Sequence, residues 1–386
     1  MIIVFLNNKL ITCDTIVPFL FELKQKQTNQ VIELFCFNES TYNAIMQNTV
    51  LAEAINGFGI LRLFGSKTNS FSDQVKGKIF AVSNLFRLCM LVIFRSVYII
   101  HFKALNYWPL KLLFILNRKR VVLFQPTIAG STELENKVDN IAKKRRIPAR
   151  PVGSVLIGFH KNWSAFQSIS QPNTTKLLIS ATFKRRVWME HLRRHGSDHL
   201  KSIGIRPGER FITFILSSMC TNSWLKNPDD FPILFDETLQ ILSEVCPELP
   251  IVIKPHPATL PENIELQKII MKKHGKLKLI STQINPMLLA SQSEFFISNC
   301  YSSTFVMAKE SNVSTIEYTD PCNTILKNTK GGSMRPDMVD YFIRRNPRKL
   351  RAVLDQLLNS SAGKKREAIT DKDQDDYGVA LELFAP

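Results

Sequence analysis

The sequence lacks the patterns that mark several large classes of protein. Its seven cysteines are scattered and include no Cys-x-x-Cys pair, which argues against a disulfide framework and a zinc site. No Gly-x-Gly-x-x-Gly follows the first expected strand, so the fingerprint of a dinucleotide-dependent dehydrogenase is absent. Acidic residues are few: 33 Asp and Glu stand against 50 Lys and Arg, a formal net charge of +17. This excess favours a polyanionic partner, such as nucleic acid, anionic lipid or a phosphorylated substrate.

No long apolar run is free of charge. The most apolar segment, residues 79–100, approaches the length of a membrane span but contains Arg87 and Arg95. Each arginine near the centre of a bilayer costs about 2.5–3.5 kcal/mol on insertion scales. We prefer a buried helix over 79–94 followed by a strand over 97–102. A segment that lies against an anionic membrane surface and a true span stay open as alternatives.

Short apolar runs alternate with helix-type stretches along most of the 386 residues. The runs are continuous, which is typical of strands buried on both faces of a parallel sheet. This rhythm predicts two doubly wound α/β domains, as in the two-Rossmann-domain glycosyltransferases. The expected domains cover 1–175 and 205–360, with a basic linker over 176–204 and a polar tail over 361–386. The expected strands are 2–6, 31–37, 61–64, 97–102, 121–124, 211–216, 251–254, 278–280, 295–298 and 315–318.

One candidate binding motif is IVIKPHPATLPE, residues 251–262. An apolar strand ends at Lys254, and His256 follows it between two prolines that stiffen the loop. Ligands of open α/β sheets bind outside the carboxyl ends of the strands. We therefore expect the imidazole to donate a hydrogen bond to a phosphate, with Lys254 adding charge. The alternative is a loop histidine that binds a neighbouring carbonyl group.

A second motif is FFISNCYSSTFVMAKE, residues 295–310. A strand runs into a short polar loop, and we expect a helix over 303–311 that opens at Ser302 or Ser303. Helix N-termini of this kind bind phosphate through their N–H groups. Taken alone, simple capping is the preferred interpretation. The two motifs can nevertheless open on the same edge of one sheet.

Together the two motifs resemble the HP and Ser/Thr motifs of bacterial GT-B glycosyltransferases that use CMP-activated sugars. This family includes sialyltransferases, polysialyltransferases and Kdo transferases of capsule and lipopolysaccharide assembly. The resemblance covers about residues 205–330 and implies two Rossmann-like domains facing a central cleft. It also implies that His256, Ser302 and Ser303 hold the phosphate and ribose of the donor nucleotide, in a C-terminal nucleotide-sugar-binding domain. The first domain would be on the acceptor side.

The catalytic acid is less well defined. Sialyltransferases of this fold carry a D/E-D/E-G motif in the N-terminal domain, and the first half of this sequence contains no such triplet. The nearest candidates follow strand ends: Asp14, and Glu133 in the stretch FQPTIAGSTELE. Glu133 is equally explained as an acidic residue in the first turn of a helix. Both an inverting and a retaining mechanism stay open.

The resemblance implies the partners as well. We expect a cytidine-nucleotide sugar donor and a saccharide or lipid-linked acceptor, with no cofactor and no metal, because histidine, lysine and a helix N-terminus can neutralise the phosphate. We expect a cytoplasmic protein, either free or peripheral at the inner face of the cell membrane. A CDP-glycerol-type glycerophosphotransferase is the first alternative. The second is a nucleic-acid-binding or scaffold protein, which the basic runs 143–146 and 184–186 do not favour because they lack interleaved aromatic residues.

Two further segments have competing interpretations. His191, His195 and His199 have the spacing of one helix face, which suggests a metal site. We prefer a solvated basic face, with contact to a phosphate or to the acceptor as the functional alternative. The run GGSMRPD, residues 331–337, is either a loop that closes over the donor or, by preference, a surface turn.

Overall fold

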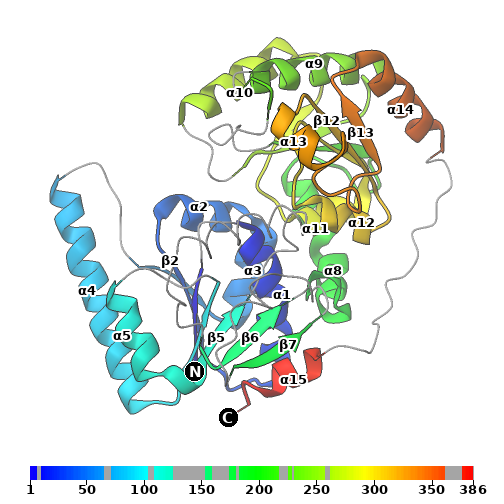
Figure 1. Ribbon diagram of the computed structural model, residues 1–386. Coiled ribbons are helices and arrows are strands. Elements are labelled where there is room, and N and C mark those ends of the chain that lie inside the picture. The colour runs from blue at the N-terminus through cyan, green and yellow to red at the C-terminus, as the bar shows by residue number, and fades with distance from the viewer. Residues whose placement is uncertain are drawn as a thin grey trace. The chain divides into compact units, whose positions relative to one another are not determined.

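The chain folds into two compact units (Figure 1). The first contains residues 1–189 and 370–386, and the second contains residues 190–369. The computed structural model describes residues 1–6, 10–64, 71–102, 108–124, 153–158, 174–179, 182–216, 225–227, 230–256, 261–360 and 376–385.

The first unit is built on a seven-stranded parallel sheet in the order β3-β2-β1-β4-β5-β6-β7. The order reverses between β1 and β4, which is the topological switch point of a doubly wound sheet. The central strands are fully buried, as their continuous apolar sequences predict. The strands are β1 (Ile2–Phe5), β2 (Ile32–Cys36), β3 (Ile60–Leu63), β4 (Tyr98–His101), β5 (Val121–Phe124), β6 (Val155–Gly158) and β7 (Thr175–Leu178).

Helices cover this sheet and begin where the sequence supplies caps. Asn38 and Asn48 each accept a hydrogen bond from a backbone N–H in the first turn of the following helix. The described helices are α1 (Leu10–Lys26), α2 (Glu39–Gln47), α3 (Thr49–Phe58), α4 (Phe71–Phe94), α5 (Trp108–Leu116) and α15 (Tyr377–Glu382), with 3₁₀ turns at Arg118–Arg120 and Thr182–Lys184. The chain passes from the first unit to the second within α8 (Arg186–Ser202).

The C-terminal residues return to the first unit. Asp376 binds β7 twice: its carboxylate accepts from the N–H of Leu178, at 2.8 Å, and its own N–H donates to the Leu178 carbonyl. In α15, Tyr377 and Leu381 are buried, as is Phe384 just beyond it. Within the expected polar tail, this segment is therefore a packed helix, because its apolar residues recur at helical spacing. The expected linker over 176–204 likewise contains most of β7 and α8.

The second unit has a six-stranded parallel sheet in the order β10-β9-β8-β11-β12-β13. Its order reverses between β8 and β11. The strands are β8 (Phe211–Ile215), β9 (Ile251–Lys254), β10 (Leu279–Ser281), β11 (Ser293–Ser298), β12 (Ser314–Thr319) and β13 (Tyr341–Arg344). The helices are α9 (Asp230–Val245), α10 (Pro261–Lys273), α11 (Pro286–Gln292), α12 (Phe305–Glu310), α13 (Asn323–Asn328) and α14 (Pro347–Ser360).

One apolar core fills the space between this sheet and its helices. The rings of Phe214 on β8 and Phe235 on α9 meet edge to face, with centroids 5.3 Å apart. Leu350 and Leu354 of α14 pack into the same core. Burial on this scale fixes the strand register, and the register in turn fixes which side chains stand at the carboxyl edge of the sheet.

Candidate functional site

The register of the second sheet brings chemically active residues into one row at its carboxyl edge. Ile215 of β8 pairs with Lys254 of β9 on one side and with Ser298 of β11 on the other. Ser298 in turn pairs with Glu317 of β12. Lys254 and Ser298 are thus separated by two strand spacings, about 10 Å. The two motifs found in the sequence follow these residues, so both open on the same edge and flank the switch point.

The loop after β9 is held in place by Gln283, which follows the neighbouring strand β10. Lys254 is 7% exposed, and its ammonium donates to the carbonyl oxygen of Gln283, at 3.2 Å. The Gln283 side-chain amide donates to the carbonyl oxygen of Pro255, at 3.1 Å. His256 comes next and is half-buried. These two hydrogen bonds fix the backbone from which His256 extends. Lys254 itself is buried.

The loop after β11 differs from its expected form. The helix α12 begins at Phe305, with Thr304 as its N-cap residue, and not at Ser302 or Ser303. The preceding residues form a turn in which the carbonyl groups of Ser302 and Ser303 accept from the N–H groups of Phe305 and Val306. The Ser302 hydroxyl accepts from the Thr304 N–H, at 3.2 Å. These N–H groups are therefore used within the turn, and the half-buried hydroxyl groups are the donors that the loop can offer to a phosphate.

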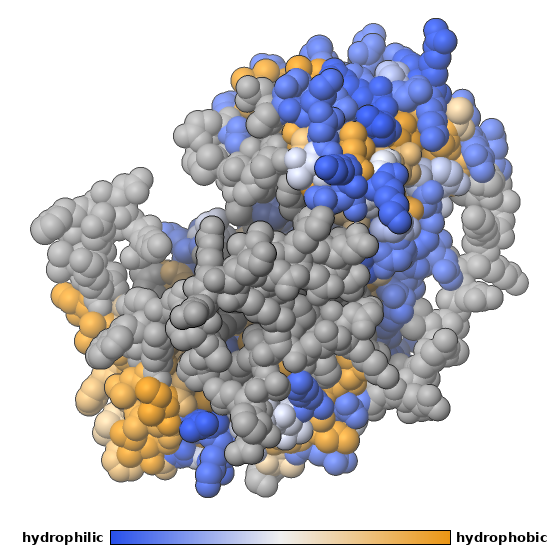
Figure 2. All heavy atoms as spheres, in the orientation of Figure 1, coloured by the Kyte–Doolittle hydropathy of each residue, from blue (hydrophilic) through white to orange (hydrophobic). Residues whose placement is uncertain are grey.

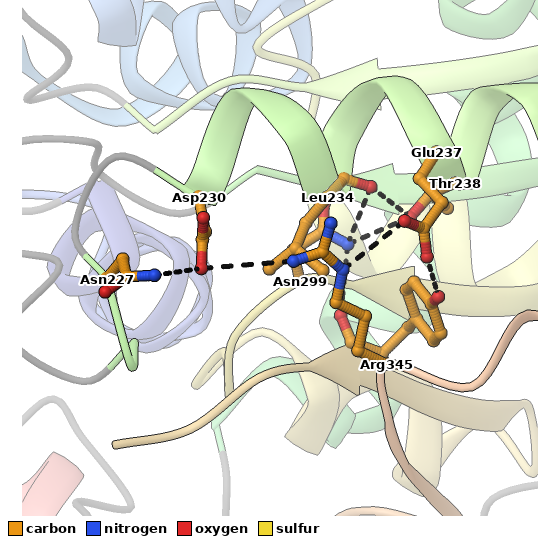
Figure 3. Close-up of polar contacts among 8 residues, drawn as sticks. Asn227, Asp230, Leu234, Glu237, Thr238, Asn299 and Arg345 are labelled. Carbon is orange, nitrogen blue, oxygen red and sulfur yellow. Dashed lines mark hydrogen bonds and ion pairs between the residues drawn. The ribbon is translucent and has the colours of Figure 1, made fainter.

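Asn299 anchors this loop to the helix α9 (Figure 3). Its side-chain amide is fully buried and donates to the Thr238 hydroxyl at 2.9 Å and to the carbonyl of Tyr318 at 3.0 Å. A longer contact of 3.4 Å joins it to the carbonyl of Leu234. Asn299 thus links β11, β12 and α9 at the start of the loop that contains Ser302 and Ser303, which we call the serine loop. Sequence reasoning did not single it out, although a polar residue directly after an apolar strand was a usable signal.

An ion-pair network extends from this anchor along α9 (Figure 3). Arg345, just after β13, lies 3.4 Å from the Glu237 carboxylate and 4.0 Å from that of Asp230. The hydroxyl of Tyr318 donates to the same Glu237 carboxylate. Burial, together with this acidic neighbour, holds the pKa of Tyr318 well above its usual range, so the phenol stays a donor. The network therefore fixes the first half of α9 against β12 and β13.

Glu317 is the second residue that sequence reasoning missed. Its carboxyl group is buried beside the serine loop, where it accepts from the Ser333 hydroxyl at 2.6 Å and from the backbone N–H of Tyr301. Burial raises the pKa of Glu317 to about 7, and the two hydrogen bonds oppose this rise. An acidic residue in the middle of an expected strand was the signal available in the sequence.

The segment 331–337, expected by preference to be a surface turn, is packed. Ser333, Met334 and Arg335 are all buried. The Arg335 guanidinium forms an ion pair with Asp337 through Nε and Oδ1, at 2.7 Å. Ser333 donates to the Glu317 carboxyl group, which in turn accepts from the N–H of Tyr301. The segment is therefore linked to the serine loop through Glu317.

The two candidate catalytic carboxylates belong to the first part of the chain. Asp14 lies in the second turn of α1, the helix that follows β1 at the switch point of the first sheet, and it is 2% exposed. It is thus within a helix and not in a loop after a strand. Glu133 lies outside the described residues, as do Gln125 and Gly130 of the same stretch.

The histidines of α8 share one face of that helix, as their spacing predicts. The rings of His191 and His195 are 4.9 Å apart, and His199 is buried. In the part of the chain that the structure describes, no group of three or more His, Cys, Asp or Glu side chains is placed to hold a metal ion.

No protein-family model and no curated protein sequence matches the chain. Among solved structures, the UDP-GlcNAc 2-epimerase of Methanocaldococcus jannaschii is similar over 99% of this chain and 98% of its own, with 13% identity and a TM-score of 0.57. The same enzyme in complex with UDP-GlcNAc and UDP gives a TM-score of 0.58 at 12% identity, with the same coverage.

A plant protein shows the same likeness. UGT73P12 of Glycyrrhiza uralensis is similar over 99% of this chain and 94% of its own, with 9% identity and a TM-score of 0.51. At these identities the likeness concerns the fold alone. The chain has the GT-B fold, with two Rossmann-like α/β units, as the sequence predicted.

Proposed function

We propose that the protein is a glycosyltransferase whose donor is a sugar activated by a cytidine nucleotide, a CMP-nonulosonate or CMP-Kdo. The observation that carries the proposal is the placement of His256 and the Ser302–Ser303 loop on either side of β8, at the switch point of the second sheet. The two motifs lie where an α/β sheet binds nucleotides, and they are the pair that resembles the CMP-sugar family.

The chemistry of the loops suits a nucleotide phosphate. An imidazole in the loop after β9 and two hydroxyl groups in the loop after β11 supply hydrogen-bond donors, and these loops follow strands that lie two spacings apart in the sheet. Such donors stabilise the negative charge of a phosphate as the bond to the sugar breaks, so we propose that no metal is needed. Lys254 contributes its positive charge from the end of β9.

The remaining assignments extend the proposal. The acceptor is a surface polysaccharide or a lipid-linked saccharide, and the protein acts on the cytoplasmic side of the membrane. Asp14 and Glu133 are the proposed catalytic carboxylates. A uridine nucleotide is the second candidate for the donor, because the structurally similar Methanocaldococcus jannaschii enzyme was solved with UDP-GlcNAc and UDP.

A thermal-shift screen against CMP, CDP, UMP, UDP and GDP tests the base and the phosphate count together. A ligand at a hundred times its dissociation constant stabilises the folded protein by about 2.7 kcal/mol. We expect CMP to give the largest shift, unchanged when EDTA is added. The largest shift with CDP would favour a CDP-glycerol-type phosphotransferase, and with UDP a uridine donor. No shift with any nucleotide would contradict the proposal.

Ser303 separates phosphate binding from a purely structural role of the loop. Ser303→Ala is expected to lower CMP affinity about tenfold or more, because a hydrogen bond to a charged group contributes about 1.5–3 kcal/mol. Its stability should change little. Ser302→Ala also removes the bond to the Thr304 N–H, so it should lose affinity and, in addition, about 1 kcal/mol of unfolding free energy.

Isothermal titration with CMP and chemical denaturation measure the two effects. Ser243→Ala is the matched control: Ser243 lies near the far end of α9, where its hydroxyl donates to the carbonyl of Gln240. That variant should bind CMP like the parent. Loss of stability without loss of affinity in both loop variants would show that the serines only hold the turn.

A further inference from the structure

The helix α4 exposes apolar side chains to solvent along a full face. Phe86 is 66% exposed and Phe94 is 73% exposed, and on the neighbouring helix α5, Ile115 is 69% exposed. Figure 2 shows these helices as an orange area at the lower left of the molecule. We call this surface the α4–α5 face; its described members are Ile79, Val82, Phe86, Met90, Ile93, Phe94, Leu112, Ile115 and Leu116.

The outer face of α4 is as regular as its buried face. Ala81, Leu85 and Leu88 lie against the core of the first unit. Exposed Ile79, Val82, Phe86, Met90 and Ile93 recur three or four residues apart and occupy an arc of about 80° on the opposite side. A helix that packs on one side only needs one apolar face. The second face therefore requires an explanation beyond the folding of this unit.

Positive charge borders the apolar area at one end. Arg95 follows α4, and Arg118, Lys119 and Arg120 follow α5; all four are exposed. The two helix ends are joined by the Asn117 side chain, which donates to the Val97 carbonyl at 2.6 Å.

The Met1 amino group lies at the same end, where it donates to the Ser96 carbonyl at 3.3 Å. Burial, and then the positive charges of Arg120 and Arg95, lower the pKa of this amino group. From residue 74 to residue 132, the sequence contains nine Lys and Arg and no Asp or Glu. The apolar face and the basic cluster therefore adjoin, without acidic residues from this stretch.

We propose that the α4–α5 face binds the surface of an anionic lipid bilayer. Phe86, Ile93, Phe94 and Ile115 would enter the boundary between headgroups and acyl chains, while Arg95, Arg118 and Lys119 contact lipid phosphates. An apolar face bordered by basic side chains is what such a surface recognises. The inference goes beyond the proposed function and rests on residues outside the nucleotide-binding loops.

The charge pattern distinguishes a bilayer from a second copy of the chain. A symmetric dimer through this face would place the same surface of both copies together. The basic cluster of each copy would then face a surface whose residues 74–132 include no Asp or Glu, so it would find no acidic partner there, whereas a bilayer offers lipid phosphates. No helix in the described residues is long and apolar enough to cross a membrane.

Vesicle co-sedimentation tests the proposal with the full chain. The vesicles are phosphatidylcholine alone, or phosphatidylcholine and phosphatidylglycerol in a three-to-one ratio. We expect binding to the mixed vesicles that weakens as salt is raised, and much weaker binding to phosphatidylcholine. The double variant Phe86→Gln/Ile93→Gln should bind about a hundredfold more weakly, because two apolar side chains no longer enter the lipid. Arg118→Gln/Lys119→Gln should lose roughly tenfold to thirtyfold.

Matched controls lie on α10 of the second unit and just after it. Ile264→Gln/Ile269→Gln removes two exposed apolar side chains, and Lys272→Gln/Lys276→Gln removes two exposed charges. Both controls should bind vesicles like the parent, and all four variants should melt like it. Equal binding to both vesicle types, or unchanged binding of the α4 variant, overturns the proposal. So does a parent that is a dimer by light scattering and becomes a monomer on Phe86→Gln/Ile93→Gln. All four variants should bind CMP like the parent, so a failure of the membrane proposal is distinct from a failure of the proposed function.

Discussion

His256→Ala is expected to lower the affinity for CMP, or turnover with a CMP-sugar, by about tenfold to a hundredfold. His256 follows β9 in the loop that Gln283 holds through Lys254 and Pro255, at the edge of the sheet where the nucleotide phosphate is proposed to bind. A hydrogen bond to a charged phosphate contributes about 1.5–3 kcal/mol, which sets the size of the loss. His256 is half-buried and lies beyond the end of the strand, so the fold should survive, with about 1 kcal/mol or less lost in unfolding free energy.

His274→Ala is the matched control for this variant. His274 follows α10, which runs from the carboxyl edge of the sheet back to its amino edge, and it binds Asp236 at 2.7 Å. Its loss should lower the unfolding free energy by about 1–3 kcal/mol and leave CMP affinity unchanged. Titration calorimetry and urea denaturation of both variants give the two quantities. If His256→Ala binds and turns over like the parent, the histidine has no role at the donor site.

The parallel sheets could be predicted from the sequence because most of their strands are continuous apolar runs. Buried strands such as IIVF and VVLF are continuous apolar runs, and each expected run became a strand within one or two residues of its predicted limits. β6, β7 and β13 were missed. TKLL and YFIR each carry a charged residue, whereas VLIG is as apolar as IIVF but lies beside Pro151 and Gly153, which favour a loop.

The carboxyl-edge location of the two motifs followed from the same rhythm, because strand ends of a parallel sheet share one edge. The contacts inside the site did not. Asn299 and Ser333 come from separate segments and both bind β12, Asn299 at the Tyr318 carbonyl and Ser333 at the Glu317 carboxyl group, and nothing in their local sequence encodes these contacts. The start of α12 was also misplaced, because Ser302 and Ser303 are good caps by type, but their carbonyl groups close a turn before the helix.

Replacing Glu317 by glutamine is expected to stabilise the protein at alkaline pH. The carboxyl group has an ordinary pKa of 4.5 when the chain is unfolded, and burial raises the pKa of Glu317 to about 7 in the folded protein. Between these values the folded state binds more protons than the unfolded state, so the unfolding free energy falls as pH rises. The stabilisation that protonated Glu317 adds to the unfolding free energy is fully present below pH 4.5 and is lost as pH rises through 7. A difference of about 2.5 units corresponds to about 3 kcal/mol.

The amide of Glu317→Gln cannot ionise, yet its oxygen still accepts from the Ser333 hydroxyl. Urea denaturation of parent and variant should therefore give unfolding free energies within about 1 kcal/mol at pH 5, whereas at pH 8 the variant should be more stable by up to about 3 kcal/mol. Glu248→Gln, at an exposed position of the same unit, should follow the parent at both values. A difference between Glu317→Gln and the parent that is the same at pH 5 and pH 8 would show that the carboxylate is already ionised in the folded protein. Because the ionised carboxylate lies beneath the Tyr301–Ser303 loop, it would repel a phosphate bound there. CMP affinity of the parent should then fall between pH 6 and pH 8 more steeply than that of Glu317→Gln.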